Sequence, residues 1–192
     1  MAWALWITGI PGSGKTTLAR ALCSRLSQEG LAVERLELDE MRRLVTPVPT
    51  YTEAERELVY RAFVYAAARL VRAGRRVILD ATAHRRRWRD LAGQIIPRFA
   101  AVELRCPVEV CAARERVRDP GYAPPGVYAA AAGPSATVPG VNLPYERSEA
   151  GELILDTAIL TADEALERLV AFVRTSLEPA GDRGPGETGA RG

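Results

Sequence analysis

Apolar runs of strand length alternate with segments of helical spacing along most of the chain. The runs that predict buried strands are residues 2–8, 32–38, 76–80, 101–105 and 152–156. Apolar positions that recur every three or four residues predict helices over residues 15–28, 39–44, 53–72, 85–94, 108–118 and 162–177. Strands and helices that alternate in this way indicate an α/β fold, in which helices cover both faces of a parallel sheet.

Two segments depart from this alternation. Residues 119–144 are rich in Gly, Pro and Ala and have no clear period, and a loop of this length is usually functional or mobile. We expect a lid over about residues 114–144. The tail at residues 179–192 is small, polar and Gly-rich, so we expect it to be disordered. The remaining pattern predicts one domain over residues 1–178.

The stretch GIPGSGKTT follows the first predicted strand and opens the first predicted helix. It fits the G-x-x-x-x-G-K-[ST] pattern of a phosphate-binding loop, because glycines let backbone N–H groups turn inward and the helix presents its positive end. A dinucleotide fingerprint fits worse, because Thr17 stands where its third glycine would be. We expect a nucleoside triphosphate and its Mg²⁺ to contact Gly9, Pro11, Gly12, Ser13, Gly14, Lys15, Thr16 and Thr17.

Composition supports this interpretation and limits the alternatives. Lys15 is the only lysine among 26 basic residues, so lysine is kept where the loop needs a slim ammonium. A net charge of +2 does not suggest a nucleic-acid binder held by bulk charge. Three cysteines without metal or disulfide spacing favour a reducing cytosol. No signal peptide and no apolar run of membrane-spanning length is present, so we expect a cytoplasmic protein.

Acidic residues follow the second and third predicted strands, and ligands of such sheets bind beyond the carboxyl ends of the strands. Asp39 could accept a proton from an attacking hydroxyl or hold Mg²⁺ through water, and it could also be the N-cap of its helix. Asp80 fits the acidic residue of a magnesium shell with Thr16, or else a cap for the next helix. His84 fits a structural or substrate-contacting role better than a catalytic one.

The arginines fall into groups by position. Arg42 follows the second predicted strand. Arg114 and Arg118 are four residues apart and share a helix face, which suits a lid that closes over a transferring phosphoryl group. The run at residues 85–87 is typical of a solvated helix start, and Arg116 is typical of a surface charge.

Four stretches together resemble the adenylylsulfate kinase family: GIPGSGKTTLA at residues 9–19, CPVEVCAAR at 106–114, GVYAAAAG at 126–133 and, most specifically, PGVNLPYERSEAGELILDT at 139–157. The resemblance covers roughly residues 4–176. It implies a phosphate-loop kinase fold with sheet order 2-3-1-4-5. It also implies Mg²⁺-dependent transfer of the γ-phosphate of ATP to the 3′-hydroxyl of adenylyl sulfate.

By position, Asp39 and Arg42 match the acidic and basic residues that follow the second strand in the family, and Arg56 and Arg61 match its substrate arginines. These matches, together with the phosphate loop and the acidic residues at the strand ends, assign an expected role to each candidate residue. We expect catalytic residues at Lys15, Asp39 and Arg42, metal ligands at Thr16 and Asp80, and nucleotide contacts from Arg114 and Arg118 besides the loop. We expect acceptor contacts at Asp39, Arg42, Arg56, Arg61, Ala81, Thr82 and Tyr128.

The sequence departs from the family on the acceptor side. Residues 38–42 read LDEMR, where the family usually has an Asp-Gly-Asp-Asn-x-Arg-like run, and the asparagine expected just after Arg56 is absent. Four alanines at residues 129–132 follow Tyr128 in place of lysines and an arginine, and residues 119–125 look inserted.

These departures keep two alternatives open. Residues 51–90, with their LDAT series, resemble a broader group of kinases related to polynucleotide kinases and zeta toxins. The first alternative is therefore a kinase of the same fold that phosphorylates another hydroxyl, on a nucleoside, an alcohol, a metabolite or a nucleic-acid end. The second is a nucleotide hydrolase or switch, against which the acceptor-side arginines argue. The expected partner is a small molecule with a hydroxyl group, and a homodimer is compatible with the sequence.

Overall fold

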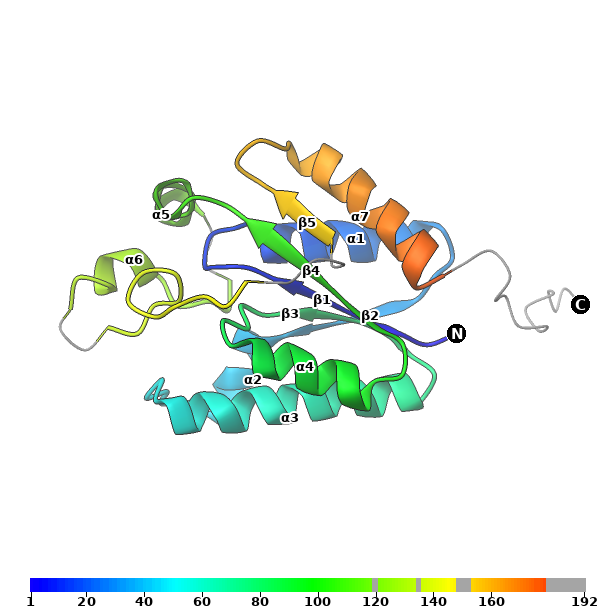
Figure 1. Cartoon of the computed structure of the whole chain (residues 1–192), viewed down its shortest axis with the longest axis horizontal. Coiled ribbons are helices and arrows are strands. Elements are labelled where there is room, and N and C mark those ends of the chain that lie inside the picture. The colour runs from blue at the N-terminus through cyan, green and yellow to red at the C-terminus, as the bar shows by residue number, and fades with distance from the viewer. Residues whose placement is uncertain (119–120, 134–135, 148–152, 179–192) are drawn as a thin grey trace, which may run out of the picture.

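The computed structural model describes residues 1–118, 121–133, 136–147 and 153–178, and a five-stranded sheet lies at its centre (Figure 1). Neighbouring strands run parallel in the order β2-β3-β1-β4-β5. This confirms the predicted α/β class and the predicted strand order. The strands are β1 Ala4–Thr8, β2 Val33–Glu37, β3 Arg76–Asp80, β4 Phe99–Arg105 and β5 Leu153–Asp156.

Helices cover both faces of the sheet. α1 and α7 pack on one face, and α3 and α4 pack on the other (Figure 1). None of the described helices is both long enough and apolar enough to cross a membrane. The helices are α1 Lys15–Gln28, α2 Leu38–Val45, α3 Glu53–Arg72, α4 Arg86–Ile95, α5 Val108–Val117, α6 Val127–Ala130 and α7 Ala162–Ser176.

The central strand β1 is buried along its full length, because it lies between β3 and β4 with helices on both faces. Its side chains alternate between two hydrophobic clusters, as the strand period of two requires. Leu5 and Ile7 join the cluster under α1 and α7, whereas Trp6 joins the cluster under α3 and α4. The Trp6 ring packs against Tyr60 and Phe63, with centroids 6.2 and 5.8 Å away. β1 therefore gives the loop that follows it a rigid base.

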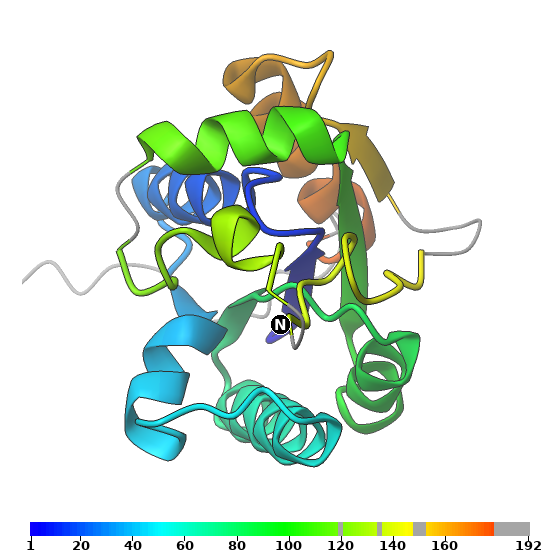
Figure 2. The ribbon, with the colours of Figure 1, turned by 90° about the vertical axis from the view of Figure 1, so that its left-hand side faces the viewer.

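The carboxyl ends of the strands lie along one edge of the sheet, which faces the viewer in Figure 2. α5, α6 and residues 136–147 cross this edge. Two contacts hold the last of these segments to the strand ends. The Tyr145 hydroxyl lies 2.8 Å from Thr8 Oγ1, and Glu146 N donates to His84 O at 2.8 Å. Ligands of parallel sheets bind at this edge.

The element boundaries differ from the predicted ones chiefly near this edge. α2 begins at Leu38, so Asp39 lies in the first helical turn and is not the N-cap that the sequence allowed. The short helix α6 is not predicted by the sequence, because four residues are too few to show a helical period. Residue 152 of the fifth predicted strand and the tail at residues 179–192 lie outside the described residues. The disorder expected of that tail and the domain boundary before it stay predictions.

His84, the only histidine, is fully buried between β3 and α4. Its ring meets the Trp88 ring edge to face, with centroids 5.0 Å apart. Neither ring nitrogen has a hydrogen-bond partner within the described residues. Burial, assisted by the positive charges of Arg56 and Arg85, lowers the pKa of His84 from 6.5 to about 3. The ring is therefore neutral at pH 7, which suits a structural role.

Acid should destabilise the fold through His84. Between pH 6.5 and about 3, the unfolded chain binds a proton at this position that the folded chain does not bind. The free energy of unfolding is therefore highest above pH 6.5, and it falls with falling pH by up to about 1.4 kcal/mol per pH unit. Urea unfolding of the wild type and of His84→Leu, at neutral pH and near the acid end of this window, measures the effect. The free energy of unfolding should depend less steeply on pH in the variant than in the wild type. An equal dependence in both would contradict the buried neutral ring.

Candidate functional site

The loop between β1 and α1 forms a phosphate cradle, because its glycines leave room for the backbone of neighbouring elements. Gly12 has a φ of +78°, and a Cβ atom there would lie 2.5 Å from Cys111 O. A Cβ atom on Gly9 would lie 2.7 Å from Leu104 O. A residue with a side chain would therefore displace backbone at either position. The loop enters α1 at Gly14, so the free N–H groups of the first helical turn point toward the cradle.

Lys15 places a half-buried ammonium in this loop. Its Nζ donates to Ile10 O at 3.0 Å. Burial lowers the pKa of Lys15, and the nearby carboxylates of Asp80 and Asp39 oppose that shift. Thr17, the last of the predicted loop contacts, is exposed. The ammonium is thus the charged group that the loop presents to the strand ends.

A cavity of about 350 Å³ extends from the loop across the ends of the neighbouring strands. Its walls come from the loop, from α2 and α3, and from the segments on either side of α6. A volume of this size lies in the range of small-molecule sites. The predicted site residues that line it are Pro11, Lys15, Thr16, Asp39, Arg42, Arg56, Asp80, Ala81, Thr82 and Arg118.

Three carboxylates line this cavity, and two of them, Asp39 and Asp80, lie near the ammonium, whereas Glu37 pairs with Arg35. Burial raises the pKa of Asp39 and of Asp80, and Lys15 opposes the shift in both. Asp80 accepts a hydrogen bond from Arg35 Nη1 at 3.1 Å and another from the Thr16 hydroxyl. The two carboxylates therefore differ, because Asp80 is held by a cation and a hydroxyl whereas Asp39 faces the cavity beside Lys15.

The opposite wall of the cavity is built around Tyr51. Its backbone has a φ of +53°, which is uncommon for a residue other than glycine. Arg42 and Arg56 lie over its ring, with Cζ atoms 5.1 and 5.4 Å from the centroid, in cation–π geometry. Glu55 pairs with Arg42 at 2.8 Å and accepts hydrogen bonds from the N–H groups of Thr50 and Tyr51 at 2.5 and 3.3 Å. These contacts hold the strained backbone and present the ring to the cavity.

Arg56 is a buried cation whose hydrogen bonds, among the described residues, go to carbonyl and hydroxyl oxygens. Its Nε donates to Tyr51 O at 2.9 Å, and its Nη2 donates to Thr137 O and Oγ1 at 2.8 and 3.1 Å. Burial lowers the pKa of its guanidinium. Arg56 therefore joins the start of α3 to the segment beyond α6, and its charge stays available to an anionic ligand.

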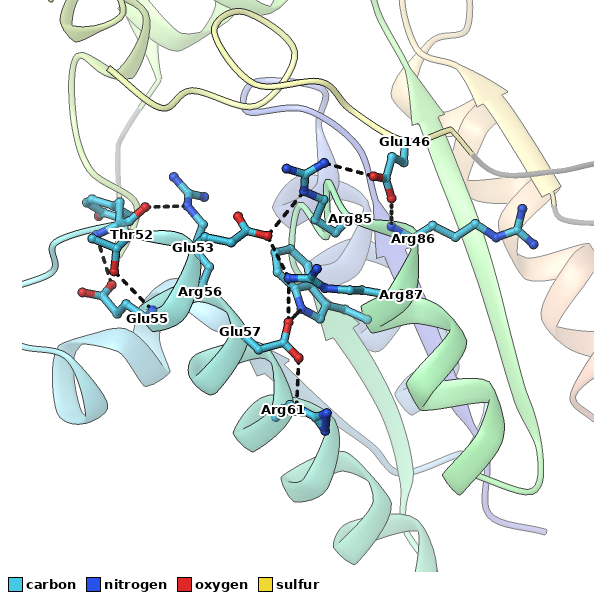
Figure 3. A network of polar contacts seen from close by, with 12 residues as sticks. Thr52, Glu53, Glu55, Arg56, Glu57, Arg61, Arg85, Arg86, Arg87 and Glu146 are labelled. Atoms are coloured by element: carbon cyan, nitrogen blue, oxygen red, sulfur yellow. Dashed lines mark hydrogen bonds and ion pairs between the residues drawn. The ribbon is translucent and has the colours of Figure 1, made fainter. Parts of the chain in front are cut away.

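An ion-pair network extends this wall to α4 and to residues 144–147 (Figure 3). Arg85 lies 3.5 Å from a carboxylate oxygen of Glu53 and 3.1 Å from one of Glu146. Arg87 pairs with Glu53 and Glu57 at 2.7 and 2.8 Å. The interpretation of this arginine run as a solvated helix start is wrong for Arg85, whose side chain is 29% exposed and paired on two sides.

Two predicted acceptor residues lie outside the cavity. The Arg61 side chain is 60% exposed and pairs with Glu57 at 2.9 Å. A spacing of five residues turns it about 140° away from Arg56 around the helix, so it points away from the cavity, and its predicted acceptor contact stays a prediction that this orientation does not support. Tyr128 lies behind the phosphate loop, and its hydroxyl donates to Pro11 O at 2.6 Å. Its contact is with the loop and not with the cavity.

The two predicted lid arginines, Arg114 and Arg118, lie in different places. Arg114 Nη2 donates to Thr157 O at 2.6 Å, and the Thr157 hydroxyl donates to Ser13 O at 3.0 Å. Arg114 therefore lies beside the phosphate loop and outside the cavity. α5 ends at Val117, so Arg118 has extended backbone, and it is Arg118 that reaches the cavity. The shared helix face predicted for this pair is wrong for that reason.

The sequence analysis missed two aromatic residues of the cavity, Tyr51 and Tyr60. The Tyr60 hydroxyl accepts a hydrogen bond from Ala83 N at 2.9 Å, and its ring stacks on Trp88 with centroids 3.8 Å apart. A signal for Tyr51 was available, because an apolar or aromatic residue directly before an N-cap such as Thr52 commonly packs back onto its helix. Tyr60 lies one turn after Arg56 on the same helix face, which was a second signal.

Comparison with known proteins identifies the family. The family model for adenylylsulphate kinase matches residues 1–156. The chain belongs to the adenylylsulfate kinase family. The resemblance drawn from the loop and from residues 139–157 is thereby confirmed.

Individual adenylylsulfate kinases align with this chain over most of its length and over most of their own. The chain is 37% identical over 158 residues to a probable adenylyl-sulfate kinase of Archaeoglobus fulgidus. The aligned region covers 82% of this chain and 97% of that protein. It is 32% identical over 173 residues to an adenylyl-sulfate kinase of Paraburkholderia xenovorans, with 89% and 92% covered. The solved APS kinase CysC of Mycobacterium tuberculosis, in complex with AMPPNP and APS, matches with a TM-score of 0.78 at 24% identity, over 90% of this chain and 97% of that one. At this identity, the similarity to the solved structure supports the assignment of the fold alone.

Glu55 should be critical for the stability of the site. Burial raises the pKa of Glu55, but hydrogen bonds from Thr50 and Arg42 outweigh burial and lower it, so the group is ionised at pH 7. Glu55→Ala should reduce the free energy of unfolding by about 3 kcal/mol, because it leaves the buried guanidinium of Arg42 without its carboxylate. Chemical denaturation at neutral pH measures the loss. Glu53→Ala removes an exposed pair on the same helix and should cost less than about 1 kcal/mol. Equal losses would argue against the buried pair.

Proposed function

We propose that this chain transfers the γ-phosphate of ATP to the 3′-hydroxyl of adenylyl sulfate. One observation carries the proposal, namely a single cavity lined by Lys15 of the phosphate loop and, on its other side, by Asp39 and Arg56. A donor phosphate at the loop and an acceptor hydroxyl beside Asp39 would meet in one space, as in-line transfer requires. The relatives named adenylyl-sulfate kinases support this choice of acceptor.

The donor phosphates would lie in the loop at residues 9–17. The loop amides would hold their oxygens, and Lys15 would reach the β- and γ-phosphates. In the structure, Lys15 Nζ donates to Ile10 O at 3.0 Å. A phosphate oxygen is a stronger partner than this carbonyl, because its hydrogen bond to an ammonium joins two charges. If the phosphate oxygen replaced Ile10 O as the partner of Lys15, the ammonium would lie beside the transferring phosphoryl group.

Mg²⁺ would be held by Thr16 and Asp80, which fit the ion because both offer oxygen ligands beside the loop. Asp80 is buried and hydrogen-bonded to Thr16. The described residues contain no group of three or more His, Cys, Asp or Glu side chains that could hold a metal by themselves. Mg²⁺ commonly takes one or two protein ligands and completes its shell with phosphates and water. When bound, the ion neutralises charge on the phosphates.

Asp39 would accept the proton of the acceptor hydroxyl. Burial raises its pKa, which makes its carboxylate a stronger base than an exposed aspartate. Lys15 opposes this shift and so favours the ionised carboxylate that a general base requires. Arg42, three residues further along α2, would serve the acceptor electrostatically, since its guanidinium lines the cavity while paired with Glu55.

The wall around Tyr51 would recognise the acceptor. An aromatic ring in contact with two guanidinium groups can stack on a nucleobase, and Arg56 has no carboxylate partner among its described hydrogen bonds. Arg56 would therefore pair with the anionic group of the acceptor. Arg118 would act from the lid, because its Nε is buried without a hydrogen-bond partner in the described part of the chain and its side chain lines the cavity.

We also infer that residues 1–178 form one kinase domain. The two hydrophobic clusters on the faces of the single sheet draw on residues from Trp3 to Leu177, which supports one folding unit. No second sheet is present among the described residues.

A kinase of the same fold that phosphorylates another hydroxyl is the second candidate. One observation favours it, because Arg118 is the only cation that the described lid residues contribute to the cavity. Ala130 lines the cavity within the alanine run at residues 129–132, where basic residues are expected from the family. An acceptor with fewer anionic groups than adenylyl sulfate would suit such a lid.

Transfer of radiolabelled γ-phosphate separates these candidates. The purified chain, given labelled ATP and MgCl₂, should label adenylyl sulfate in preference to a panel of nucleosides and small alcohols. Label on another acceptor alone would replace the first candidate by the second. Loss of ATP without any labelled acceptor would point instead to a hydrolase or switch.

Lys15→Ala should reduce kcat by about 10²-fold or more, because it removes the cation that faces the developing charge. Circular dichroism and thermal unfolding should show a folded chain, which separates lost chemistry from lost structure. Lys15→Arg should not restore activity, since a guanidinium is too broad for the cradle. Near-normal turnover of the alanine variant would refute the assignment.

Arg56 and Arg61 provide a matched pair on one helix. Arg56→Gln should raise KM for adenylyl sulfate about ten-fold or more, because it removes a buried cation at the acceptor wall. Arg61→Gln should leave KM and kcat within about two-fold, because its exposed pair with Glu57 contributes little. Steady-state kinetics with the acceptor varied at saturating ATP provides the test, and similar effects of the two substitutions would contradict the observed orientation of Arg61.

A further inference from the structure

Residues 121–127, here called the proline wall, close one side of the cavity. Ala123, Pro124, Pro125 and Val127 line it. Proline has no backbone N–H, so this wall offers shape and apolar surface more than hydrogen bonds. Residues 121–125 of this wall also belong to the stretch that looks inserted relative to the family.

The end of the proline wall that leads into α6 is anchored by buried contacts. Glu115 is 7% exposed, and its carboxylate accepts hydrogen bonds from Gly126 N at 2.8 Å and Val127 N at 3.3 Å. Directly beyond this end, the Tyr128 hydroxyl donates to Pro11 O at 2.6 Å. This end is therefore fixed to α5 and to the phosphate loop.

The other end of the proline wall is held by an exposed residue of α2. Arg43 Nη2 donates to Gly121 O at 3.0 Å, and Arg43 Cζ lies 4.7 Å from the centroid of the Tyr122 ring. We call these three residues the latch. Gly121 has a φ of +56°, which residues with a side chain rarely adopt, so the turn that brings its carbonyl to Arg43 favours glycine.

The latch joins the proline wall to the helix that carries the acceptor residues. Arg42 is buried and lines the cavity, while Arg43, the next residue of α2, is exposed and reaches Tyr122. Successive residues of a helix point about 100° apart, so one helix can serve both contacts. Release of the latch would let the wall move relative to α2, and the width of the cavity would change with it.

We propose that Arg43 is a positioning residue that determines acceptor specificity, because it holds the proline wall against the acceptor through Tyr122. The inference rests on the proposed function, since adenylyl sulfate is taken as the acceptor. Arg43 does not line the cavity, so it would act on the acceptor through the wall. Loss of the latch should therefore weaken acceptor binding and leave the contacts of the nucleotide phosphates unchanged.

Steady-state kinetics of Arg43→Gln and Tyr122→Leu test the latch. Each variant should raise KM for adenylyl sulfate about three- to ten-fold, the scale of one exposed cation–π contact and one hydrogen bond. KM for ATP and kcat should stay within about two-fold, because the loop is not displaced. The double variant should be no worse than the more damaged single variant, since both substitutions remove the same contact.

Hydrogen exchange of residues 121–127 provides a readout that does not depend on activity. The amides of this segment should exchange faster in Arg43→Gln than in the wild type, because the end near Gly121 loses its contact with α2. Arg72→Gln, which removes an exposed cation at the far end of α3, should change neither the kinetics nor the exchange.

Failure of this inference is distinguishable from failure of the proposed function. If the wild type phosphorylates adenylyl sulfate and both latch variants keep its KM for the acceptor, the role of Arg43 is overturned. Equal increases in KM for ATP and for the acceptor would also overturn it, since they indicate general damage. If the wild type does not label adenylyl sulfate, the proposed function fails, and unchanged exchange in Arg43→Gln would then overturn the latch by itself.

Discussion

The constraint on which the rest of the structure depends is the position of the half-buried Lys15 beside the carboxylates of Asp39 and Asp80. An isolated charge in such a place would be costly, so each of these groups is stabilised by the opposite charge near it. The three residues meet because β1 lies beside β3 and β3 lies beside β2, so the segments that follow these strands emerge at one edge. The cavity is the space that this arrangement leaves open to a ligand.

Much of this arrangement could be predicted from the sequence, because it depends on residues that are near one another in the chain. The apolar runs predicted the strands, and the spacing of residues 9–17 predicted the loop with Lys15. The position of Asp80 at the end of β3 followed from the same pattern. The position of Arg61 outside the cavity could also have been predicted, since the helical period alone turns it away from Arg56.

The rest could not be predicted, because it depends on contacts between distant segments. Arg56 meets Thr137, and Arg43 meets Gly121, only after the segments around α6 have crossed the edge of the sheet. In these cases an arginine makes the long-range contact. Its planar group offers several donors at once, which suits a chain whose only lysine lies in the phosphate loop.

The position of β1 at the centre of the sheet has a consequence for the order of folding during synthesis. β1 is translated before its partners β3 and β4, which come much later in the chain. Gly9 and Gly12 also pack against Leu104 and Cys111. The phosphate loop therefore leaves the ribosome well before the segments that give it its shape. Nucleotide can stabilise a nascent chain only after its fourth strand has been made.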